Sequence, residues 1–112
     1  MKVSIGPLLA SLPRAASDKW PGGEPFADAL AHGTMSVEVF APRGNDAQEP
    51  HTQDELYFVI SGTAQFIHEA KRMSVASGDV LFVPAADRHH FEEMSDDFVT
   101  WVVFWGPQGG ER

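Results

Sequence analysis

The chain has 112 residues, enough for one domain with one hydrophobic core, so there is no room for a second folded domain. Sixteen acidic residues against eight basic ones give a net charge of -8, which argues against nucleic acid as a partner because phosphate backbones would be repelled. The chain has no cysteine, so a bound metal must use histidine, carboxylate or amide ligands, and no stretch approaches the roughly 20 apolar residues of a membrane span.

The N-terminal segment is expected to form a short helix over residues 5–12. Ser4 stands at the helix start and Pro13 just beyond its end, which are the positions that these residue types favour. The apolar run from residue 3 to residue 12 is interrupted by Ser4, Gly6, Pro7 and Ser11, unlike the continuous core of a secretion signal. We therefore expect a cytoplasmic protein that does not insert into a membrane.

Residues 14–26 are expected to form a loop because they contain Pro21, Gly22 and Gly23. Trp20 and Phe26 are expected to anchor this loop to the core, and the alternative is an exposed aromatic lid. We expect residues 1–33 as a whole to form an N-terminal extension made of a short helix and a loop.

From residue 34 onward the chain alternates short β-type segments with turn residues. The predicted strands cover residues 34–40, 55–61, 64–68, 80–83 and 98–105. Regular spacing of this kind predicts an all-β domain, an antiparallel sandwich or barrel, over residues 34–105. Residues 106–112 are expected to form a polar C-terminal tail.

The densest polar group, residues 49–55, leads straight into the apolar strand. Charged and imidazole side chains entering a core need partners. Because side chains alternate along an extended chain, Glu49 and His51 share one face before a turn at residues 52–54, and Glu55 and Tyr57 share a face after it. We expect both pairs to face one cavity.

A second segment, residues 78–91, runs from a Gly-Asp turn through an apolar strand to two histidines. In an extended chain only His89 shares the face of Phe91, so His90 is expected to point outward.

These two segments resemble the two motifs of the cupin superfamily. The first motif ends in H, three or four residues, E, six residues, G, which His51, Glu55 and Gly62 match. The second reads G, five residues, P-x-G, two residues, H, three residues, N, which is matched by Gly78, Pro84 and His89. The resemblance covers residues 44–93 and implies a single antiparallel β-barrel, or jelly roll, with a metal bound by His51, Glu55 and His89.

The chain departs from the cupin motifs at four positions. Glu49 stands at the first histidine and Gly44 lies one residue too close to it, while Ala86 replaces a glycine and Glu93 the asparagine. Either Glu49 is a fourth ligand, which gives two histidines and two carboxylates suited to Mn, Fe, Ni or Zn, or it points away and leaves open positions. Gln53 is a weaker candidate for a ligand or for a residue that supports one.

Other polar and aromatic residues have simpler interpretations. Tyr57 is a candidate general acid or substrate contact, or a core residue. His32 is expected at a turn or strand edge and His68 on a solvent-facing hairpin. The acidic cluster of residues 92–97 is best explained as a solvated loop.

Two functions follow from this interpretation, and the substrate is not determined. The first is a metal-dependent oxygenase or isomerase acting on a small oxygen-bearing molecule, with Tyr57 or Glu49 transferring protons. The second is a non-catalytic module that binds or senses a small molecule, and a structural barrel is a weaker third possibility. The resemblance also implies a homodimer, with residues 1–33 either at the interface or packed on their own barrel.

Overall fold

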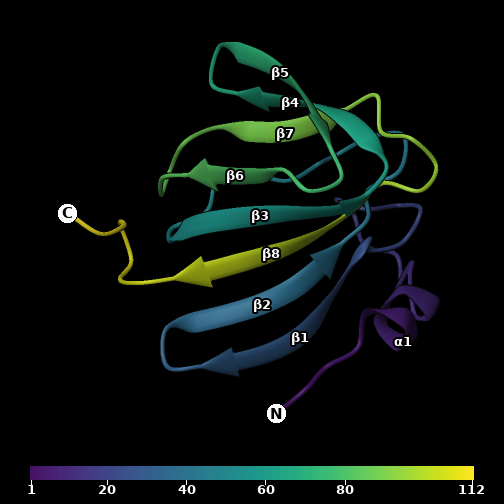
Figure 1. Ribbon diagram of the computed structural model, residues 1–112, viewed down its shortest axis with the longest axis horizontal. Helices are drawn as coiled ribbons and strands as arrows, with labels where there is room; N and C mark the ends of the chain where they lie inside the picture. Colours follow the sequence, from purple (N-terminus) through teal and green to yellow (C-terminus); the bar gives the residue numbers. More distant parts are fainter.

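The computed structural model describes all residues from 1 to 112 and contains one short helix and eight strands (Figure 1). The all-β prediction is therefore confirmed. The elements are α1 (Ile5–Ala10), β1 (Phe26–His32), β2 (Met35–Phe40), β3 (Asp54–Ser61), β4 (Thr63–His68), β5 (Lys71–Ala76), β6 (Val80–Val83), β7 (His89–Glu92) and β8 (Val99–Trp105).

The strands form two antiparallel sheets that enclose the core. One sheet has the order β1-β2-β8-β3-β6, and the other has the order β5-β4-β7 (Figure 1). Both sheets contribute apolar side chains to one interior cluster: Tyr57 and Val102 come from the larger sheet, and Phe66 and Phe91 from the smaller. Trp20 is buried in the same cluster, so its predicted anchoring role is confirmed.

The five predicted strands lie within two residues of observed ones, and β6 matches its predicted range. Three further strands, β1, β5 and β7, were not predicted. The expectation that residues 1–33 contain only a helix and a loop is wrong for residues 26–32, because β1 pairs along β2. β1 contains three alanines and an aspartate, which have low strand propensity, so its pairing with β2 rather than its own sequence makes it a strand.

The register of the larger sheet places two rows of side chains on its interior face. Glu55 on β3 lies opposite Phe104 on β8 and Val83 on β6. In the next row, Tyr57 lies opposite Val102, which in turn lies opposite Glu38 on β2. Directly paired residues point to the same side of a sheet, so these rows define the interior wall beside the polar cluster.

Helix α1 ends at Ala10, two residues before the predicted end. Ser4 stands at the N-cap, as expected, but its side chain makes no capping hydrogen bond. The N-terminal segment packs on the outer face of the larger sheet, where leucines at positions 8, 9 and 12 contact the cluster that includes Ala27 and Val39. The apolar side of the N-terminal segment therefore covers its own subunit. It is the only helix, and it is too short to cross a membrane.

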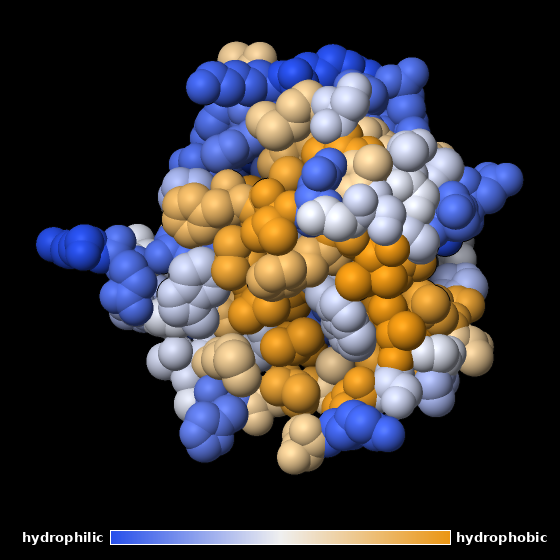
Figure 2. All heavy atoms as spheres, viewed as in Figure 1, coloured by the Kyte–Doolittle hydropathy of each residue, from blue (hydrophilic) through white to orange (hydrophobic).

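The rest of the outer face of the larger sheet is apolar and uncovered. Figure 2 shows hydrophobic side chains gathered over the middle of this face, with hydrophilic ones around its edge. The exposed side chains come from adjacent strands, Phe58 and Ile60 from β3 and Val80 and Phe82 from β6. Contiguous apolar areas on small domains are common at contact surfaces.

Candidate metal centre

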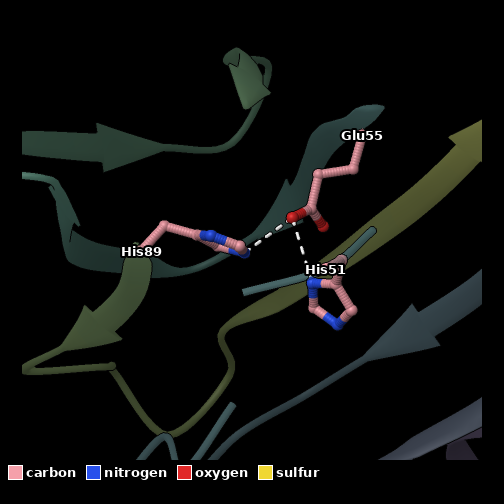
Figure 3. Close-up of side chains that lie close together, drawn as sticks. All are labelled: His51, Glu55 and His89. Atoms are coloured by element: carbon pink, nitrogen blue, oxygen red, sulfur yellow. Dashed lines mark hydrogen bonds and ion pairs between the residues drawn. The ribbon is translucent and has the colours of Figure 1, made fainter. Parts of the chain in front are cut away.

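Three side chains predicted as metal ligands meet in the interior (Figure 3). Nε2 of His89 lies 2.6 Å from Oε1 of Glu55, and Nδ1 of His51 lies 3.2 Å from the same oxygen. The potential ligand atoms all lie within 4.8 Å of one another. The side chains of Glu55 and His89 are almost fully buried, whereas that of His51 is 36% exposed and opens the cluster to one side.

His51 precedes β3 in an irregular segment rather than in a strand, and hydrogen bonds to a second turn hold it in place. The backbone N–H of Ala86 donates to the carbonyl of His51 at 2.8 Å, and the N–H of Ala85 donates to Oδ1 of Asp54 at 2.9 Å. Ala86 adopts a left-handed backbone with φ 73°, a conformation that favours glycine. This explains why the cupin motif has a glycine at this position.

His89 begins β7, and its ring orientation is fixed by the residue two positions earlier. Its Nδ1 lies 2.9 Å from the backbone carbonyl of Asp87, and a carbonyl only accepts, so Nδ1 carries the proton. In the neutral ring, Nε2 then presents a lone pair to the cluster, as a metal ligand requires. His68 does not face solvent as expected, because its Nε2 bonds the Asp87 carboxylate at 2.8 Å and secures this turn.

Two buried polar atoms at the centre of the cluster lack hydrogen bonds. They are Oε2 of Glu55 and Nε2 of His89, whose short contact with Oε1 does not have hydrogen-bond geometry. A buried polar atom without a partner costs about 1–3 kcal/mol. Two imidazoles and one carboxylate form a donor set suited to Mn, Fe, Ni or Zn, so the residues fit a divalent metal ion that would satisfy both atoms.

The charges of the three groups support one another. Burial alone would raise the pKa of Glu55, but the hydrogen bond with His51, the close contact with His89 and the positive charge of the two rings outweigh it and lower that pKa. Burial alone would lower the pKa of His89, but the Glu55 carboxylate and the Asp87 carbonyl outweigh it and raise that pKa. Without a metal, the cluster therefore favours a carboxylate beside a protonated imidazole.

Glu49, the other candidate ligand, lies outside this cluster. Its side chain is 75% exposed, and its carboxylate pairs with Nζ of Lys19 at 3.3 Å. Gln53 donates to the carbonyls of Thr34 and Gly106 instead of approaching the cluster. His90 points away from the cluster, as expected, and pairs with Glu92.

Tyr57 is buried beside the cluster and belongs to a hydrogen-bond chain that the sequence analysis did not identify. Its hydroxyl donates to Oε1 of Gln48 at 2.9 Å, and the Gln48 amide donates to Asp46 at 2.6 Å. Asp46 also accepts the backbone N–H of Phe91 at 2.8 Å, which joins the segment before His51 to β7. Burial, with the negative charges of Glu55 and Asp46, raises the pKa of Tyr57 well above its usual range, so its hydroxyl stays protonated.

A cavity of about 320 Å³ opens beside His51 and contains a carboxylate that the sequence analysis missed. This residue is Glu38 on β2, which lies on the interior face two residues from Phe40. Burial raises its pKa to about 7, Asp28 and Glu55 act in the same direction, and His51 opposes them. The sequence offered one signal for Glu38, namely a single carboxylate two residues before Phe40 in the largely apolar segment 35–40.

The two antiparallel sheets and the interior His-His-Glu cluster define a small β-barrel of the cupin type with a candidate metal site. Residues 36–105 match the Cupin_2 family, described as a cupin domain, and since this is more than half of the chain, the protein belongs to that family.

The chain is also similar to individual proteins. An uncharacterized protein of Streptomyces coelicolor is 39% identical over 85 residues, which cover 74% of this chain and 81% of the relative. The HTH-type transcriptional activator RhaS of Yersinia pestis is 30% identical over 73 residues, 65% of this chain but only 27% of the activator. A Cupin 2 conserved barrel domain protein from Salinispora arenicola shares the fold with a TM-score of 0.63 and 19% identity, over 72% of this chain and 74% of that one.

Proposed function

We propose that the protein binds one divalent metal ion through His51, Glu55 and His89, and that a small oxygen-bearing molecule reaches this ion from the adjoining cavity. The observation that carries the proposal is the pair of buried atoms without hydrogen bonds, Glu55 Oε2 and His89 Nε2. A keto acid, a phenol or a sugar derivative has the required oxygen atoms, and a cavity of about 320 Å³ suits a molecule of this size.

The catalytic form of this proposal is a metal-dependent oxygenase or isomerase. A bound ion would polarise a ligand oxygen or, if it were iron or manganese, support oxygen chemistry. Tyr57 remains protonated, and its hydroxyl already donates to Gln48, whereas Glu49 lies at the cavity rim, where it can accept a proton if it leaves Lys19.

The alternative is a module that binds or senses a small molecule without changing it. The similarity to RhaS favours it, because the matched 27% of that protein forms part of a transcriptional activator, and a binding module would serve such a protein. A ligand that raises the melting temperature and is recovered unaltered supports sensing, whereas turnover of that ligand excludes it.

The metal proposal is tested by calorimetric titration of the chelator-treated full chain with Mn²⁺, Ni²⁺ and Zn²⁺, and with Fe²⁺ without oxygen. We expect about one equivalent to bind wild type and none to bind the His51→Ala, His89→Ala double variant. His90→Ala is the matched control, because this neighbouring imidazole points away from the cluster. A wild type that binds no ion after reconstitution refutes the proposal.

A purely structural role for the cluster makes a different prediction. The alanine variants would then lower the melting temperature equally with and without chelator. If the cluster binds metal, chelator lowers the melting temperature of wild type and of His90→Ala but leaves that of the double variant unchanged.

We also propose that a second copy of the chain covers the apolar outer face. Taking about 200 Å² for an exposed phenylalanine, Phe58 at 37% and Phe82 at 53% exposure leave roughly 180 Å², and Ile60 and Val80 extend this area. The half-buried Trp101 and Trp105 lie on the same face and enlarge the patch, which would form the apolar centre of an interface of ~800 Å² per partner.

Light scattering tests the dimer. We expect a dimer for wild type and a folded monomer for Phe82→Lys, which places a charge in the middle of the face. If wild type is monomeric at a protein concentration of about 100 µM, the dissociation constant lies above this value and the proposal is overturned.

A further inference from the structure

The cavity beside the metal centre has aromatic walls. Trp20 packs edge-on against Phe26 and Phe40, with ring centroids 6.4 and 6.2 Å apart, and all three line the cavity. Phe104 lines it near the metal centre, 4.8 Å from the His51 ring. Aromatic faces carry partial negative charge, so walls of this composition attract cations, above all ammonium groups.

The cavity also holds a carboxylate without a partner. Glu38 makes no hydrogen bond or ion pair, and only burial and more distant charges act on it. Lys19 is the one permanently charged cation in the lining, and it is paired with Glu49 at the rim. An unpaired, partly buried carboxyl can take up a proton when the cavity is empty, and when it is ionised a ligand of opposite charge stabilises it.

The charges of the metal centre do not satisfy Glu38. A divalent ion there would be offset by Glu55 and by one anionic oxygen of the ligand. Glu38 stands on β2, across β8 from β3, outside the cluster of potential ligands. Its charge therefore calls for a second, separate cation. The carboxylates of Asp28 and Glu55 and the imidazole of His51 are the charged groups acting on it, and their balance is negative.

We propose that this cavity selects a small zwitterion, whose ammonium group lies among the aromatic rings beside Glu38 while its anionic oxygen reaches the metal. The inference rests on the proposed metal site for the oxygen end only. The ammonium end depends on Glu38 and on the rings of Trp20, Phe26 and Phe40, which the chain supplies with or without metal.

The test compares two probes that differ in charge and hardly in shape. Glycine betaine carries a trimethylammonium group and a carboxylate, and 3,3-dimethylbutyrate replaces the nitrogen with carbon. We expect the metal-loaded chain to bind betaine about tenfold more tightly than 3,3-dimethylbutyrate by calorimetry at pH 8. In Glu38→Gln this preference should fall by at least about threefold, because only the rings remain to attract the ammonium group, while metal affinity stays within about twofold.

The matched control is Asp96→Asn, which removes an equal charge from an exposed residue and should keep the preference. Equal binding of the two probes by wild type, binding of neither probe by the metal-loaded chain, or an unchanged preference in Glu38→Gln overturns the inference.

A metal-free comparison separates this inference from the proposed function. If wild type binds no metal, the proposed function fails. The ammonium site can still be tested in the metal-free chain by comparing the affinities of choline and 3,3-dimethylbutanol, which differ only in nitrogen or carbon at the trimethyl centre. A choline preference that requires Glu38 supports it, and equal binding refutes it.

Discussion

Replacing Glu38 with glutamine should make the stability of the protein less dependent on pH. Burial raises the pKa of Glu38 to about 7 in the folded chain, against an ordinary value of 4.5. The folded state therefore binds the proton more tightly than the unfolded state does. The resulting stabilisation is fully present below pH 4.5 and is lost as the pH rises through 7. Glutamine resembles the protonated acid and should not show this loss.

The size of the effect follows from the difference between the two pKa values. It corresponds to an upper limit of about 3 kcal/mol, since each pKa unit is worth about 1.4 kcal/mol. The side chain is partly exposed, and solvent screening reduces this value to about 1–2 kcal/mol. We expect Glu38→Gln and wild type to be about equally stable at pH 4.5, and the variant to be more stable by that amount at pH 8.5.

Urea unfolding followed by tryptophan fluorescence measures this difference. Both proteins should be kept in chelator, because a bound metal would change the charges around Glu38. Titration of Glu55 and His89 affects both proteins alike and largely cancels in the comparison. Stability curves that run parallel from pH 4.5 to 8.5 would refute the assignment of a raised pKa to Glu38.

Four further substitutions test how the turns and the Asp46 hydrogen bonds hold the site, each by urea unfolding. Gly62→Ala should lower the free energy of unfolding by more than 2 kcal/mol, because the added Cβ would lie 2.6 Å from backbone atoms of Phe98. Gly78→Ala has open space around the added Cβ, so it should lower the free energy of unfolding by only about 1 kcal/mol, from its positive φ alone. An equal cost at the two glycines would contradict the steric argument. Ala86→Gly should stabilise by up to about 1 kcal/mol, because φ 73° is strained for alanine, and a loss of stability would show that the strain is absent. Asp46→Ala should cost about 2–3 kcal/mol, since it leaves buried donors unpaired, and a near-neutral effect would show that the chain of hydrogen bonds is dispensable.

Local sequence was sufficient to predict the strands that carry the core and three residues of the candidate site. β6 and β3 are apolar runs bounded by turn residues, and both signals act over a few neighbouring positions. The spacing of His51, Glu55 and His89 was informative because alternation along an extended chain fixes the face of each side chain. The structure brings these three together as that interpretation required.

Strands without a strong signal of their own depended on their partners. β5 is mostly exposed and β7 has only four residues, so neither shows the alternation of a half-buried strand over enough positions. β5 is held by a tight hairpin with β4, in which His68 pairs with Lys71, whereas β7 pairs with the other edge of β4 from about 20 residues further along the chain.

The placement of the carboxylates is what the tertiary structure alone decided. From the sequence, Glu49 precedes His51 by two residues and could share its face, whereas Glu38 looks like one charge in the predicted strand 34–40. In the folded chain Glu49 pairs with Lys19 at the surface, and Glu38 faces the cavity. The physical reason is that residues 41–53 follow an irregular path with no fixed alternation of faces, while β2 enters a sheet whose register sets which side is interior.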